Sequence, residues 1–143
     1  MQILSVLPST KEIIFVILEE DSKYKYHSYK INNAIPIEDN MFSFFTYLST
    51  YFTENVFDLV AVIKAAPSKF GNSSFVRVKF EAIIQLVCKI NSFDCLMIPK
   101  ISITTYISKQ DKDLNEILVT EENISPKKIV DLLWLSLLAK DHL

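Results

Sequence analysis

Residues 57–63 read Phe-Asp-Leu-Val-Ala-Val-Ile, and this nearly unbroken apolar run ends at Lys64. A strand that is apolar on both faces is typical of the centre of a parallel sheet, because helices cover it from both sides. Helical apolar periodicity precedes the run in residues 41–52 and follows it up to residue 90. We therefore predict that residues 57–63 form a central parallel strand of an α/β fold.

Three further strand patterns open the chain. Residues 2–6 and 12–19 are apolar and β-branched, and the short turn between them predicts an antiparallel hairpin. Residues 24–31 alternate aromatic and polar side chains, which is typical of an edge strand with one solvated face. A fifth, short strand is predicted at residues 95–98.

Four helices complete the predicted order. Asn40 is expected to cap the first helix, Ser73 or Ser74 the second, and Ser125 before Pro126 the last. The predicted helices cover residues 41–52, about 75–90, 101–108 and 126–137. The order βββ-α-β-α-β-α-α predicts one domain over residues 1–143: a mixed five-stranded sheet, three antiparallel strands then two parallel, with helices on both faces.

The composition excludes several functional classes. The chain has 143 residues, and 15 Lys and Arg against 17 Asp and Glu give a net charge of -2, so no global charge favours nucleic acid or an anionic membrane. The single glycine, Gly71, excludes a glycine-rich phosphate loop. No apolar stretch is long enough to span a membrane, and the N-terminus lacks the basic start of a signal peptide. We expect a cytoplasmic protein without a membrane partner.

The two cysteines do not indicate a cofactor. Cys88 and Cys95 form neither a CxxC pair nor a cluster with histidine at metal-ligand spacing. Cysteines flanked by apolar residues act as small hydrophobic side chains, which is the role expected here; a bridge between the two is the alternative. We expect no cofactor and no structural zinc.

The order of elements is also that of the RNase H-like fold, and local motifs add to the resemblance. Residues 3–9, Ile-Leu-Ser-Val-Leu-Pro-Ser, resemble the opening strand of RuvC-type Holliday-junction resolvases. Residues 59–64 resemble their central strand, and residues 130–135 their last catalytic helix. The resemblance implies that Leu7 and Lys64 replace two catalytic acids, whereas Asp131 stands where a third acid lies.

A more specific resemblance, within the same fold, is to a family of uncharacterised bacterial proteins of unknown function. It is carried by Ile63-Lys64, Pro67, Lys69-Phe70 and the run Lys-Phe-Glu-Ala-Ile-Ile-Gln-Leu at residues 79–86. The family's glycine-rich turn before the helix is replaced here by Gly71-Asn72-Ser73.

When the catalytic positions of the RuvC-type resolvases are placed on this sequence, they predict a protein that is not an enzyme. Two-metal phosphodiester hydrolysis needs clustered carboxylates, and only Asp131 remains of them. Glu12 and Glu81 are interpreted as members of solvated ion pairs, Glu81 with Arg77 one helical turn earlier. We expect a binding or scaffolding module without catalytic metal; a divergent metal-dependent nuclease is an alternative.

Asp131 has two candidate partners. An ion pair between Lys64 and Asp131 would satisfy both charges where the parent fold held metal. A pair of Asp131 with Lys127 or Lys128, one turn earlier on the same helix, is equally favoured by spacing.

A local group of basic residues surrounds the predicted loop and helix N-terminus after residue 64. It consists of Lys64, Lys69, Arg77 and Lys79. Unpaired backbone N–H groups at a helix N-terminus favour an anion, so this group predicts weak binding of phosphate or nucleic acid. The alternative interpretation is a solvated run of charge.

Two predicted helices carry more apolar surface than a core needs. Aromatic side chains occupy nearly every face of residues 42–52, and the helix up to residue 90 has only a narrow polar stripe, formed by Arg77, Glu81, Gln85 and Lys89. These surfaces predict a homodimer or another protein partner. Core packing alone is the alternative.

Overall fold

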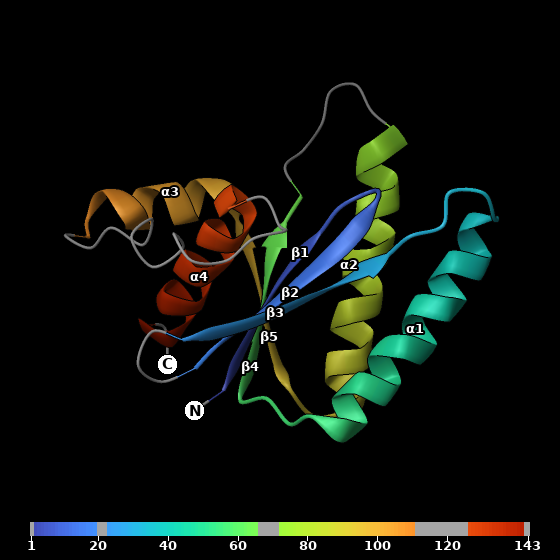
Figure 1. Cartoon of the computed structure of the whole chain (residues 1–143), viewed down its shortest axis with the longest axis horizontal. Helices are drawn as coiled ribbons and strands as arrows, with labels where there is room; N and C mark the ends of the chain where they lie inside the picture. The colour runs from blue at the N-terminus through green and yellow to red at the C-terminus, as the bar shows by residue number, and fades with distance from the viewer. Residues whose placement is uncertain (1, 20–22, 66–71, 111–125, 142–143) are drawn as a thin grey trace.

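A computed structural model describes residues 2–19, 23–65, 72–110 and 126–141, without the side chains of residues 72–74 and 126 (Figure 1). The strands are β1 (Ile3–Pro8), β2 (Glu12–Leu18), β3 (Tyr24–Lys30), β4 (Leu59–Lys64) and β5 (Asp94–Pro99). The helices are α1 (Ile37–Glu54), α2 (Asn72–Ile90), α3 (Lys100–Ser108) and α4 (Pro126–Asp141). The predicted α/β class and order of elements are confirmed. No helix in the described ranges is long and apolar enough to cross a membrane.

The strands form one mixed sheet in the order β3-β2-β1-β4-β5. β1 lies antiparallel to β2 and parallel to β4, with Leu4 opposite Ile17 on one side and Val60 on the other. β5 lies parallel to β4 and places Pro99 opposite Lys64. The carboxyl ends of β1, β4 and β5 therefore meet at one edge of the sheet.

Helices cover both faces of the sheet, α1 and α2 on one face and α3 and α4 on the other (Figure 1). Along β4, Leu59, Ala61 and Ile63 belong to the core beneath α4. Val60 and Val62 belong to the core beneath α1 and α2. Every side chain of this strand up to residue 63 is buried, which is why its sequence is apolar throughout.

α1 begins four residues earlier than the sequence indicates, after Pro36. Asn40, predicted as its cap, lies inside the helix and is buried. Its side chain accepts a hydrogen bond from Asn32 N at 3.1 Å and donates one to Asn32 O at 2.7 Å. Asn40 therefore fixes the segment between β3 and α1, because its amide satisfies a backbone donor and acceptor there.

α2 ends in a Schellman motif. Ser92 N donates to Lys89 O at 3.2 Å, and Phe93 N donates to Cys88 O at 2.9 Å. Ser92 lies in the left-handed region with φ 60°, where a side chain with a Cβ atom is disfavoured. The motif turns the chain from α2 directly into β5.

Ser92→Gly is expected to raise the free energy of unfolding by about 0.5–1 kcal/mol, because glycine occupies this conformation without the Cβ penalty. Urea unfolding followed by circular dichroism measures the change. Ser92→Ala is the control and should leave stability nearly unchanged, since it keeps the Cβ atom. A lower midpoint for Ser92→Gly would contradict the prediction.

Candidate functional site

A cavity of about 320 Å³ lies at the sheet edge where β1 and β4 end. Its apolar part is formed by Leu7 of β1 and Ile63 of β4. The charged residues around it are Lys64, Arg77, Lys100, Lys127, Lys128 and Asp131. Five cationic side chains thus face one carboxylate, in a chain whose net charge is -2. We call this the basic cavity.

Arg77 comes from the first half of α2 and is half-buried. Its Nη2 donates to the Ile63 carbonyl at 2.6 Å, at the end of β4. Its Nε is buried without a hydrogen-bond partner in the described part of the chain. Burial lowers the pKa of this guanidinium, and the nearby Glu81 charge opposes that shift. The Nη2 hydrogen bond therefore holds the Arg77 side chain in place, whereas its Nε–H group has no acceptor among the described residues.

Glu81, one turn further along α2, is only 4% exposed. Its Oε1 accepts a hydrogen bond from Ala65 N at 2.8 Å, just beyond β4. The prediction of a solvated Glu81 was wrong, because the amino-terminal half of the polar stripe on α2 faces the sheet edge rather than solvent. Arg77 and Glu81 together hold the chain where it leaves β4.

Asp131 pairs with Lys100 and not with any of the lysines predicted from the sequence. Its Oδ2 lies 3.8 Å from Lys100 Nζ, at the start of α3. The expected ion pair between Lys64 and Asp131 is not formed, although both side chains line the basic cavity. Neither is Asp131 paired with Lys127 or Lys128 within the described residues. The parallel pairing of Lys64 with Pro99 brings Lys100 to this edge, a signal that could have identified it.

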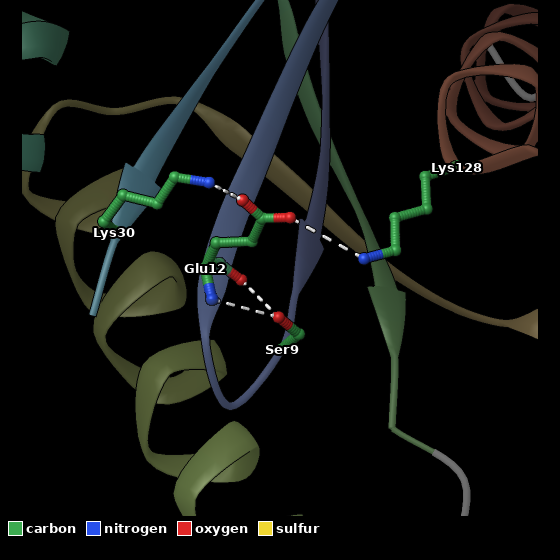
Figure 2. A network of polar contacts seen from close by, with 4 residues as sticks. All are labelled: Ser9, Glu12, Lys30 and Lys128. Carbon is green, nitrogen blue, oxygen red and sulfur yellow. Dashed lines mark hydrogen bonds and ion pairs between the residues drawn. The ribbon is translucent and has the colours of Figure 1, made fainter. Parts of the chain in front are cut away.

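Glu12 positions the last lysine of the basic cavity, as Figure 2 shows. One carboxylate oxygen binds Lys30 of β3, and Oε1 lies 3.6 Å from Lys128 Nζ of α4. Ser9 closes the turn before β2, since its Oγ donates to Glu12 O at 2.6 Å and accepts from Glu12 N at 3.1 Å. Glu12 thereby connects the β2–β3 edge to α4.

The hydrogen bond from Lys30 lowers the pKa of Glu12 below its ordinary 4.5. Because the folded pKa is the lower one, the Glu12 pair contributes stability above pH 4.5 and loses it as the pH falls through the lowered value. Glu12→Gln should therefore destabilise the protein near pH ~7 and have little effect near pH ~2. Urea unfolding at both pH values measures this difference.

Glu19→Gln is the matched control for that comparison. Glu19 pairs with Lys25 at 3.1 Å on the same hairpin, but its carboxylate is more exposed than that of Glu12. Removing its charge at pH ~7 should destabilise the protein less than Glu12→Gln does. An equal effect of the two variants would contradict the role assigned to Glu12.

The other two basic residues predicted for this site are Lys69 and Lys79. Lys79 is exposed on α2 and does not line the basic cavity. Lys69 lies outside the described residues, as do Pro67 and Phe70 of the second resemblance. Lys127 and Lys128, predicted only as possible partners of Asp131, both line the basic cavity.

This topology is the RNase H-like fold, and solved structures of Holliday junction resolvases share it. RuvC of Thermus thermophilus in complex with a Holliday junction substrate has a TM-score of 0.75 and 12% identity, over 96% of this chain and 91% of that chain. Another structure of the same RuvC has a TM-score of 0.71 and 10% identity, over 96% and 92%. The yeast mitochondrial Holliday junction resolvase has a TM-score of 0.64 and 10% identity, over 94% and 75%. No family model and no curated protein sequence matches the chain.

The prediction that the chain is not an enzyme is contradicted by these comparisons. These three solved structures are of resolvases, so the fold is one on which nucleases are built. The prediction rested on the carboxylates missing at two transferred positions, Leu7 and Lys64. Missing acids at particular positions are not positive evidence of inactivity, because fold and chemistry vary independently.

The RuvC resemblance implies divalent cations, and the described residues of the basic cavity do not fit them. Such cations take several oxygen ligands, whereas the one carboxylate here, Asp131, is paired with Lys100. Within the described ranges no three His, Cys, Asp or Glu side chains are grouped to hold a metal ion. The charge of the basic cavity suits an anion instead.

Proposed function

We propose that the protein binds nucleic acid and that the basic cavity holds a backbone phosphate. The observation that carries this proposal is the charge of the cavity: five cationic side chains from β4, α2, α3 and α4 converge beside one carboxylate. Phosphate contacts by lysine and arginine supply most of the affinity of proteins for nucleic acid. The RuvC structure was solved with a Holliday junction, which supports branched DNA as the ligand class.

The cations of the basic cavity differ in how free they are to bind phosphate. In the described part of the chain, Lys64 and Lys127 have no ion pair. Lys100 and Lys128 lie 3.8 and 3.6 Å from their carboxylates, a spacing at which an exposed pair contributes little. We propose that Lys64 and Lys127 make the main phosphate contacts.

Arg77 differs from the lysines, because its guanidinium group donates hydrogen bonds in fixed directions. Its guanidinium is fixed by the Ile63 carbonyl, and its buried Nε still lacks an acceptor. Arg77 lines the basic cavity, and guanidinium groups bind phosphate through several N–H groups at once. The residues of β4 and α2 thus orient the anion that the lysines attract.

Binding of labelled DNA tests the proposal. A four-way junction, a duplex and a single strand are titrated by fluorescence anisotropy in EDTA, from about 50 to about 200 mM salt. We expect binding without metal, tightest for the junction, that weakens as salt rises. No measurable binding at the lowest salt would overturn the proposal. The same complexes incubated with Mg²⁺ show whether the chain also cleaves the junction, as the divergent-nuclease alternative requires.

We also propose that the chain pairs with a second copy through α2. Four large apolar side chains on this helix are more than half exposed: Phe75, Val78, Leu86 and Ile90. Their spacing of three, eight and four residues places them on one helix face, opposite the core. A stripe of this kind on one helix can pack against itself across a twofold axis.

The oligomeric state tests this pairing. Light scattering with size-exclusion chromatography is expected to give a dimer for the unchanged chain and a monomer for Leu86→Glu. Phe42→Glu is the control, because Phe42 is 72% exposed on α1 and lies outside the stripe. A monomeric unchanged chain at high concentration would refute the pairing.

A further inference from the structure

The two cysteines lie side by side at the sheet edge opposite the basic cavity. Cys88, in the last turns of α2, is 1% exposed and belongs to the core beneath α1 and α2. Cys95 is the second residue of β5 and is partly exposed. Both line one open cavity of about 480 Å³, together with Gln85, Lys89, Ser92, Phe93 and Asp94. Both thiols are free.

The end of α2 brings these two residues together. The Schellman motif at Ser92 reverses the chain, and Cys88 itself accepts the hydrogen bond from Phe93 N that closes the motif. β5 then begins at once, with Cys95 held opposite Val60 of β4. Cys95 packs against the same core cluster to which Cys88 belongs. The backbone of the turn and of β5 therefore places Cys88 and Cys95 next to each other.

We infer that Cys88 and Cys95 form a reversible intramolecular disulfide when hydrogen peroxide or a similar two-electron oxidant enters this cavity. Cys95 is the reacting thiol, because it is the one that the cavity exposes. Cys88 is the resolving thiol, because it lies behind Cys95 in the core. The inference uses no residue of the basic cavity and is independent of the proposed function.

The electrostatics of the pair support this division of roles. The hydrogen bond from the Cys88 thiol lowers the pKa of Cys95, because it stabilises the Cys95 thiolate. The same hydrogen bond, together with burial, raises the pKa of Cys88. A thiolate is the nucleophile in cysteine oxidation, so the first attack belongs to Cys95.

The reaction balances in two steps. The Cys95 thiolate attacks one peroxide oxygen, the O–O bond breaks, and hydroxide leaves and takes up a proton to become water, which leaves a sulfenic acid on Cys95. The Cys88 sulfur then attacks the Cys95 sulfur and loses its proton, and the hydroxyl group departs as a second water. Two thiols are oxidised by two electrons, and one peroxide is reduced to two waters. A dithiol reductant reverses the change.

Mass spectrometry of the peroxide-treated full chain tests the inference. We expect the intact mass to fall by two hydrogen atoms, a non-reduced peptide linking Cys88 to Cys95, and recovery of the original mass with dithiothreitol. Two free thiols that persist after denaturation of the treated protein would overturn it. A disulfide between two chains, or a sulfinic acid without a linked peptide, would also overturn it.

Single-cysteine variants test the two roles. Cys88→Ala should leave a sulfenic acid on Cys95 that dimedone traps, whereas Cys95→Ala should react with peroxide at least ~10-fold more slowly than Cys88→Ala. Urea-denatured samples of both variants are the control, and their rates should be similar. Equal rates in the folded variants would overturn the assignment of Cys95. If either variant fails to fold, the linked peptide in the unchanged chain decides the inference.

Discussion

Replacing Lys64 and Lys127 together by glutamate is expected to weaken binding of a four-way DNA junction by about 100-fold near 0.1 M salt. Both side chains line the basic cavity, and neither has an ion pair among the described residues. The substitution removes two phosphate contacts and adds repulsion at the same place. The slope of log affinity against log salt is negative, and its magnitude should therefore decrease by about 2. Fluorescence anisotropy over a salt series measures both quantities.

Lys79→Glu is the matched control for that experiment. Lys79 is exposed on α2, and its substitution changes the charge by as much as one of the two cavity substitutions, but it does not line the basic cavity. Its substitution should weaken binding less than about threefold, as a screened remote charge does. If Lys79→Glu weakens binding as much as either cavity substitution, the contact lies along α2 and the basic cavity is not the phosphate site.

Phe80→Ala is expected to lower the free energy of unfolding by about 3–5 kcal/mol. Phe80 is fully buried between α2 and the sheet, and its ring meets that of Phe44 of α1 edge to face, with centroids 5.4 Å apart. The substitution removes this aromatic contact and leaves a cavity that close-packed neighbours fill only in part. Urea unfolding measures the loss.

Phe42→Ala, on α1 and outside the apolar stripe of α2, is the control for Phe80→Ala. Phe42 is 72% exposed, so its truncation removes little buried surface and should change stability by less than about 1 kcal/mol. Equal losses for the two variants would mean that α1 and α2 pack differently from the structure. A small loss of stability for Phe80→Ala would contradict the prediction, because it would mean that neighbouring side chains move in and fill the space left by the ring.

The sequence predicted the sheet well because burial acts on each residue locally. Along β4, every residue from Leu59 to Ile63 is covered by helices, so the strand had to be apolar on both faces. The edge strand β3 is solvated on one side and alternates accordingly. The prediction of Asn40 as a helix cap was wrong, because its side chain binds the backbone of Asn32 instead.

The candidate site was predicted only in part. Leu7, Lys64, Arg77 and Asp131 were singled out from sequence, and the structure brings all four to the basic cavity. The role of Glu81 and the contact of Lys100 with Asp131 were missed. Helical spacing suggested a pair between Arg77 and Glu81, but the direction in which α2 faces the sheet decides that both side chains serve the end of β4.

The amino-acid order by itself determined the elements, their sequence along the chain and which faces are apolar, because these follow from propensity and periodicity over a few residues. Only the tertiary structure decided which charges meet. Lys100 reaches Asp131, and Cys88 reaches Cys95, because strand order, parallel register and the turn after α2 place them side by side. Such contacts depend on distances between elements, which no local pattern of residues specifies.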